Sequence, residues 1–170
     1  SLMWRAIEYN HLLWVQTLDD LEFDMNITNS HETTPLMHAV EYGHEQIVRF
    51  LLRKGCEQNR TNRRKRTAVM IACDKNRPAC LKALLEHGCS PDGTDRIGQP
   101  ALRIACTDGN LECIRILLGH KCMTDIDKEE TRRWRQFMRT VMDTVGLVGA
   151  DRFQACIDLL NDYDDFSTKS

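Results

Sequence analysis

The chain has eight cysteines and six histidines, the residue types that most often hold metal ions or react with oxidants. A structural zinc site usually draws its ligands from closely spaced pairs, yet no CxxC pair occurs. Because a reduced cysteine behaves as a small apolar side chain, regular recurrence indicates packing in a core, and we expect no metal site. The recurring positions are Cys56/Cys89/Cys122, Cys73/Cys106 and Cys80/Cys113.

The histidines and carboxylates form no pattern that is typical of catalysis. The sequence contains no HExxH, Walker, GxGxxG or GxSxG motif. Four histidines form two pairs, and the members of each pair recur at equivalent positions of the chain, which indicates structural roles. Two pairs of adjacent acids occupy positions that are typical of solvated residues. We therefore expect no enzymatic activity, no cofactor and no small-molecule substrate. The residues weighed here are His11/His44, His87/His120, Glu129/Glu130 and Asp164/Asp165.

Charge and hydropathy narrow the class of protein. A formal charge of −2 and a pI near 6.3 give no overall field that would attract nucleic acid or an anionic membrane. The sequence has neither an apolar run of about 18 residues nor a signal peptide at its start, so we expect a cytoplasmic or nuclear protein with reduced thiols and no membrane insertion.

The strongest charge run is RTNRRKR, from Arg60 to Arg66. Three interpretations stay open: a solvated turn, a nuclear import signal, or a contact for an acidic partner. A nucleic-acid interface ranks below these, because no aromatic residues are interleaved with the run and no basic helix adjoins it.

These residues are ordered by an internal repeat with a period of about 33 residues. Three segments align without a gap, beginning at Thr34, Thr67 and Pro100. A fourth, degenerate copy is predicted before them. The alignment brings small residues and leucine pairs into register, as Ala39/Ala72/Ala105 and Leu51-Leu52/Leu84-Leu85/Leu117-Leu118.

Each repeat is predicted to form two short helices followed by a polar turn. The second helix carries residues such as Ile47 and Leu51 at the spacing of one buried face. Both helices end at residue types that tolerate a left-handed cap. These predicted caps are Gly43, Asn76 and Gly109 for the first helix, and Gly55 and Gly88 for the second.

The segment TPLMHAVEYGHEQIVRFLLRKG, from Thr34 to Gly55, resembles the ankyrin-repeat consensus. The resemblance extends over residues 33–125. It implies an all-α solenoid of stacked helix–turn–helix repeats with finger-like β-turn loops. Glu32 and Lys65 stand where the family usually has a turn glycine, which is retained here as Gly98.

The predicted organisation covers the whole chain. Residues 1–33 form a degenerate first repeat, 34–66, 67–99 and 100–127 are repeats, 128–162 are a degenerate C-terminal helical capping repeat, and 163–170 are a frayed tail. We expect a more polar outer face on the first repeat, because the end of an array meets water. The cap is predicted to contain an apolar helical stripe between Lys128 and Val145, followed by a second helix from Asp151.

The resemblance implies that partner contacts fall on the fingers and on the two positions before each first-helix cap, which face a concave groove. Tyr9 and Tyr42 are the leading anchors, since tyrosine is enriched at interfaces, although both could simply cover helix ends. The acids would favour Lys or Arg on a partner, and the finger arginines would favour Asp, Glu or phosphate. The predicted partner-binding residues are Glu8, Tyr9, Glu41, Tyr42, Arg63, Arg64, Arg66, Asp74, Lys75, Arg96 and Asp108.

The expected function is that of a non-enzymatic interaction module that binds a partner protein or an extended peptide of mixed charge. Such a module would belong to a larger scaffold, adaptor or regulatory protein. Two alternatives remain: a nucleic-acid-binding or nuclear-import role of the basic turn 60–66, and a structural spacer without a partner.

Overall fold

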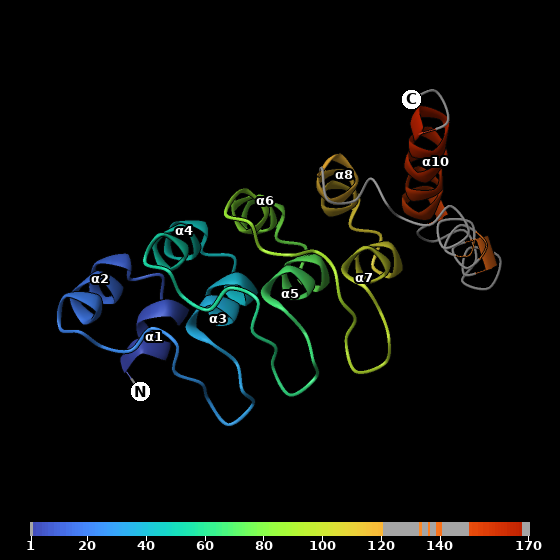
Figure 1. Cartoon of the computed structure of the whole chain (residues 1–170). Coiled ribbons are helices and arrows are strands. Elements are labelled where there is room, and N and C mark those ends of the chain that lie inside the picture. Colours follow the sequence, from blue (N-terminus) through green and yellow to red (C-terminus); the bar gives the residue numbers. More distant parts are fainter. Residues whose placement is uncertain (1, 121–132, 134–135, 137–138, 141–149, 168–170) are drawn as a thin grey trace. The chain divides into compact units, whose positions relative to one another are not determined.

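The computed structural model describes residues 2–120, 133, 136, 139–140 and 150–167 (Figure 1). This part of the chain is helical and contains no strand, so the all-α prediction is confirmed. The chain forms two compact units, Ser1–Ala101 and Leu102–Ser170. The helices are α1 Leu2–Glu8, α2 Leu12–Asp20, α3 Pro35–Tyr42, α4 Glu45–Arg53, α5 Ala68–Asp74, α6 Pro78–Glu86, α7 Ala101–Thr107, α8 Leu111–Gly119 and α10 Ala150–Ser167.

The first unit contains three helix pairs that lie side by side. Helices α1, α3 and α5 pack in one row, and helices α2, α4 and α6 pack in a second row against it. The loops that follow α2, α4 and α6 extend beyond the row of α1, α3 and α5 as three fingers (Figure 1). We call the surface made by these fingers and the adjoining first-row helices the finger face.

Local residue choices begin and end the first-row helices. Thr34 Oγ1 accepts a hydrogen bond from the backbone N–H of Met37 at 3.2 Å, and Thr67 does the same for Met70 at 3.3 Å. These bonds satisfy a backbone donor at the helix start that has no partner within the helix. At the other end, Gly43 has a φ of 79°, which confirms the predicted left-handed cap.

The core between the two rows consists of the residues that the repeat brings into register. Ala39 and Ala72 have no exposed surface, so the first-row helices approach each other closely there. Leu51 and Leu84 of the second row are also fully buried. Burial of one such leucine stabilises the fold by roughly 2 kcal/mol. No single pair could cover both of its faces, which explains why the pairs stack.

The cysteines are part of this packing, as predicted. All seven cysteines in the described residues are free and buried. Burial raises the pKa of the Cys56 and Cys80 thiols to about 11 and that of Cys89 to about 12, so these thiols stay protonated at neutral pH. In the same part of the chain, no three His, Cys, Asp or Glu residues are grouped so as to hold a metal ion. Cys122 lies outside the described residues.

The first repeat departs from the prediction of a polar outer face. Trp14 is 54% exposed and Leu2 is 55% exposed. The residues at the same positions of the next repeat, Ile47 and Pro35, are buried because a preceding helix pair packs against theirs. No helix pair among the described residues covers Trp14 and Leu2, so this expectation was wrong and the repeat carries stacking residues at an open face.

The second unit contains α7, α8 and α10. Helix α10 packs against α8 and buries Cys156, Ile157 and Leu160. The prediction of a frayed tail is wrong up to Ser167, because α10 continues to that residue without a Gly or Pro that would end the helix. Most of the stripe predicted between Lys128 and Val145 lies outside the described residues, and the capping role of 128–162 stays a prediction.

No helix in the described part of the chain is long and apolar enough to cross a bilayer.

Candidate functional site

The three fingers of the first unit are built by one side chain each, at equivalent positions of successive repeats. In the second finger, Asn62 Oδ1 accepts the backbone N–H groups of Arg64 and Arg66 at 2.9 and 3.1 Å. Asn29 holds the first finger in the same way, and the Asp95 carboxylate holds the third. These side chains give all three fingers the same turn.

The turn forces one residue per finger into the left-handed region. That residue is Glu32 in the first finger, with a φ of 59°, and Lys65 in the second, with a φ of 56°. Gly98 occupies the position in the third finger with a φ of 76°. Replacing the usual glycine therefore does not alter the fingers, because the side-chain bonds impose the turn on a residue that disfavours it.

Lys65→Gly is expected to raise the free energy of unfolding by about 0.5 kcal/mol, because relief of the left-handed strain slightly exceeds the entropy that glycine loses on folding. Urea denaturation followed by circular dichroism measures the change. Gly98→Ala is the matched control and should lower stability through the backbone alone, since a Cβ at Gly98 would meet nothing within 4 Å. A loss of stability in Lys65→Gly would contradict this explanation.

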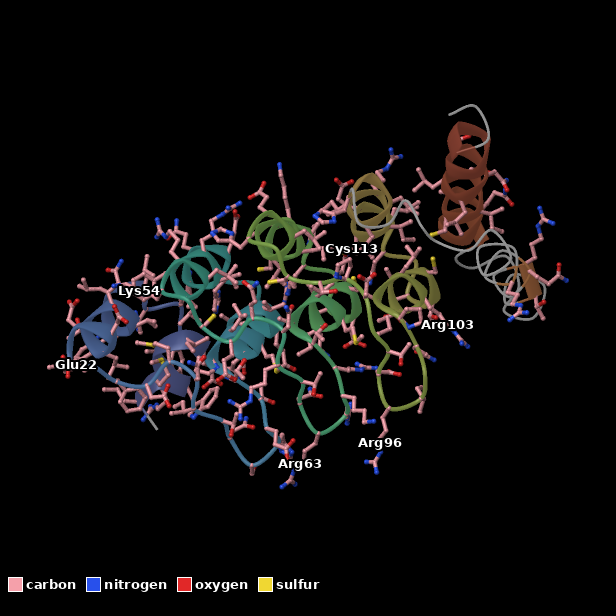
Figure 2. The ribbon with its side chains drawn as sticks, in the orientation of Figure 1. Glu22, Lys54, Arg63, Arg96, Arg103 and Cys113 are labelled. Carbon is pink, nitrogen blue, oxygen red and sulfur yellow. The ribbon has the colours of Figure 1, made fainter. Side chains whose placement is uncertain are left out.

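Backbone hydrogen bonds join each finger to the next. The N–H of Arg63 donates to the carbonyl of His31 at 3.1 Å, and the N–H of Arg96 donates to the carbonyl of Arg64 at 2.9 Å. Figure 2 shows Arg63 and Arg96 at the outer ends of neighbouring fingers, pointing away from the helices. The fingers thus form one connected surface rather than three separate loops.

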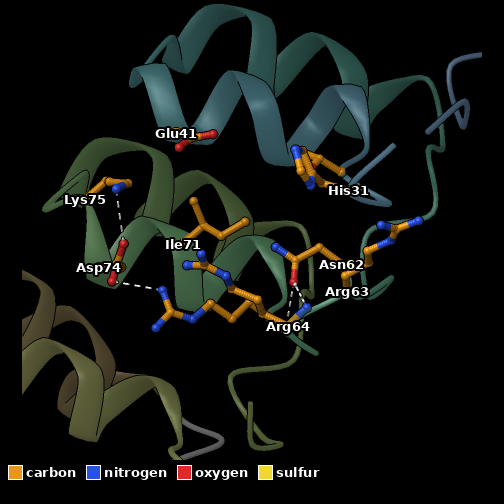
Figure 3. A pocket seen from close by; sticks show the side chains of 10 residues that line it. His31, Glu41, Asn62, Arg63, Arg64, Ile71, Asp74 and Lys75 are labelled. Carbon is orange, nitrogen blue, oxygen red and sulfur yellow. Dashed lines mark hydrogen bonds and ion pairs between the residues drawn. The ribbon is translucent and has the colours of Figure 1, made fainter. Parts of the chain in front are cut away.

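A cavity of about 290 Å³ lies where the first two fingers meet α3 and the end of α5 (Figure 3). This volume lies at the lower end of the range of ligand pockets. Six of the predicted partner-binding residues line it: Glu41, Arg63, Arg64, Arg66, Asp74 and Lys75. The sequence did not indicate the other four, His31, Thr33, Asn62 and Ile71.

Arg66 is held in place by acids of its own chain. Its guanidinium lies 2.9 Å from Asp74 Oδ1 and 3.6 Å from Asp95 Oδ2, and only 20% of its side chain is exposed. Lys75 Nζ lies 3.4 Å from the other oxygen of Asp74. Arg66 and Asp74 therefore brace the second finger against α5 and against the third finger.

The family follows from comparison with known sequences. A model described as ankyrin repeats in three copies matches residues 2–95, more than half of the chain. The chain belongs to the ankyrin-repeat family. Ankyrin repeats are generally protein–protein interaction modules and typically have no enzymatic activity. No curated protein matches the chain closely enough to be counted as a relative.

An aromatic cluster joins the first two ankyrin repeats at the finger face. The ring of His38 contacts Trp4 and Tyr42, with centroid distances of 5.2 and 4.9 Å. The Tyr42 hydroxyl donates to Glu8 Oε1 at 3.3 Å. Tyr42 is 39% exposed, so one face of this predicted anchor packs within the repeats and the other face meets solvent.

The repeat position that His44 occupies also links neighbouring repeats. His44 Nε2 lies 3.3 Å from the carbonyl of Glu8, and Arg77, at the same position of the next repeat, donates to the carbonyl of Glu41 at 3.3 Å. An arginine thus replaces histidine at this position and makes the same contact with the preceding repeat.

The other predicted contact residues occupy different places. Tyr9 is 61% exposed at the end of α1, where its ring contacts His11. Arg96 is exposed on the third finger. Asp108 is exposed after α7 in the second unit. Glu8, Glu41 and Asp74 follow one another along the ends of α1, α3 and α5, as the repeat predicts.

The stability of the first unit is expected to fall as the pH falls below about 6.5. Burial is the main cause that lowers the pKa of His38 below 6.5 in the folded protein; His44 lowers it further, whereas Glu41 and Glu8 oppose the shift. The unfolded chain therefore binds this proton at a higher pH, and the free energy of unfolding declines from about that pH until the folded-state pKa is passed. Urea denaturation at several pH values should give a weaker pH dependence for His38→Gln than for the wild type. Parallel curves would exclude His38 as the source.

Proposed function

We propose that the finger face of the first unit binds an extended segment of a partner protein. The observation that carries this proposal is the convergence of six predicted contact residues on one small cavity between two fingers and two helices. Ankyrin repeats generally bind proteins, and an open cavity with charges of both signs suits a peptide of mixed charge.

The segment would run across the first-row helix ends, beside the fingers. Exposed Tyr9 and the open face of Tyr42 supply apolar contact near the first repeat. Glu41 follows at the edge of the cavity and would attract a basic side chain. The exposed arginines Arg64 and Arg96 of the next two fingers would attract acidic ones.

Ion pairs within the chain reduce the free positive charge of the basic turn. Arg60 Nη1 lies 3.2 Å from Glu57 Oε2, and Arg63 Nε lies 3.7 Å from Glu32 Oε1. Arg66 is held by two acids. A nucleic-acid interface needs several unpaired cations along one groove. The distribution of charge therefore favours a protein partner over nucleic acid.

Affinity capture from cell extract, quantified by mass spectrometry, tests the proposal. The wild type is compared with a finger-face variant, Tyr9→Ala with Arg64→Glu, and with a control variant, Arg53→Glu, which reverses one exposed charge on α4 of the second row. We expect the finger-face variant alone to lose a protein that the wild type captures. Equal capture by all three forms, or no saturable partner at all, would contradict the proposal.

A further inference from the structure

The cavity beside the second finger contains more hydrogen-bond donors than the chain itself uses. Arg63, Arg64, Arg66 and Lys75 contribute cationic groups to its lining, whereas Glu41 and Asp74 contribute the only carboxylates there. The lining of this described cavity therefore has an excess of positive charge, in a chain whose net charge is negative.

The cationic side chains that line the cavity differ in how many acidic partners they have. Asp74 is shared by Arg66 and Lys75, and Asp95 forms a second, longer ion pair with Arg66. Arg66 Nε is buried and has no hydrogen-bond acceptor, because Asp95 Oδ2 lies too far away at 3.6 Å. The Arg64 guanidinium forms no ion pair with any described residue, although the Arg64 backbone is fixed by Asn62.

Asn62 adds an uncharged donor to the same wall. Its Oδ1 accepts two backbone N–H groups of the finger, which fixes the orientation of the amide. The amide nitrogen is therefore turned away from the loop and toward Ile71 on α5 (Figure 3). This –NH₂ group donates no hydrogen bond to the part of the chain that the structure describes.

We propose that this cavity receives one anionic group of the bound segment, a carboxylate or a phosphate, and that Arg64 is the residue that binds it. Arg64 and the Asn62 amide would donate hydrogen bonds to the anion. Arg66 would act as a positioning residue, since Asp74 and Asp95 already hold it. The inference rests on the proposed function, because it specifies what the finger face binds.

Glu41 makes the recognition directional. It lines the cavity from the end of α3, across from the arginines of the second finger, and its carboxylate forms no ion pair with a described residue. An acidic group seated on Arg64 would therefore be accompanied best by a basic group near Glu41. A segment with the two charges exchanged would place like charges together and bind more weakly.

Amide NMR titration of the isotope-labelled chain tests the inference with small probes that need no knowledge of the partner. The probes are N-acetylglutamate N-methylamide, phenyl phosphate and N-acetyllysine N-methylamide. The variants are Arg64→Gln and, as a matched control, Arg53→Gln on the second-row helix α4. Neither arginine side chain forms a hydrogen bond or an ion pair with a described residue, so both variants should keep the wild-type spectrum away from the substitution.

At least one anionic probe is expected to give saturable shifts in the amides of residues 62–66. Arg64→Gln should weaken its binding by about tenfold or more, whereas Arg53→Gln leaves it unchanged. The stronger of the two anions identifies the source as a carboxylate or a phosphate. Absence of saturable shifts with both anions, equal binding by Arg64→Gln, or equal shifts with the lysine probe would overturn the inference.

The two proposals can fail separately. Partner capture that depends on the finger face, without binding of either anion, would remove the anion site and keep the proposed function. Anion binding at Arg64, with partner capture unaffected by finger-face substitutions, would keep the site and remove the proposed function.

Discussion

Arg64→Glu is expected to weaken partner binding by about a hundredfold at low salt, because it removes charge-assisted hydrogen bonds and places a like charge against the partner's acidic group. The substitution should leave the melting temperature unchanged, since the Arg64 side chain forms no ion pair with any described residue. Isothermal titration of the purified partner measures the affinity, and thermal denaturation measures the stability.

Arg53→Glu is the matched control for this experiment. It makes the same change of charge on an exposed residue of α4, in the second row, away from the fingers. Its expected effect on affinity is less than about threefold, which is typical of a charge outside the interface. Equal losses for the two variants would indicate a general electrostatic effect instead of contact at Arg64.

Asp95→Ala is expected to lower the free energy of unfolding by about 3 kcal/mol. Asp95 is only 6% exposed, and its Oδ1 accepts the N–H groups of Ile97 and Gln99 at 3.0 and 2.9 Å. Alanine would leave these donors without their acceptor and would leave Arg66 with Asp74 alone. Urea denaturation followed by circular dichroism measures the loss.

Asp95→Asn separates the two contributions of that carboxylate. Asparagine already holds the other two fingers, through Asn29 and Asn62, so the backbone hydrogen bonds of the third finger should survive. The loss of the negative charge beside Arg66 is expected to cost about 1 kcal/mol. If Asp95→Asn proved as damaging as Asp95→Ala, the charge and not the turn would be the source of the stability.

The sequence predicts the helical architecture because its determinants are local and repeated. The constant repeat length, the buried Leu51 and Leu84, and the left-handed cap at Gly43 each follow from residue type and spacing. The same logic placed the cysteines in the core. The prediction of a frayed tail over residues 163–170 is wrong as far as Ser167, because α10 continues to that residue.

The sequence indicates six of the ten residues that line the cavity, but it does not indicate how they are arranged. Arg64 and Arg66 lie two residues apart in one turn, and the sequence alone gives them equal standing. Their difference arises from Asp74 on α5 and from Asp95, almost one repeat later, because both carboxylates lie beside the guanidinium of Arg66 and neither forms an ion pair with Arg64. His31 and Ile71 join the cavity for the same reason, because stacking brings successive repeats together there.

The exposed Trp14 shows a further limit of pattern reading. Ile47, at the equivalent position of the next repeat, is buried because a preceding helix pair packs against its own pair, so burial at this position depends on a neighbouring helix pair.

Hydrogen–deuterium exchange of the chain with and without its captured partner tests the finger-face proposal most directly. Binding is expected to slow amide exchange in the finger segments 29–33, 62–66 and 95–99 and at the ends of α1, α3 and α5. Exchange in α2, α4 and α6 should stay unchanged. Protection confined to the second-row helices, with the fingers exchanging as fast as in the free protein, would contradict the account.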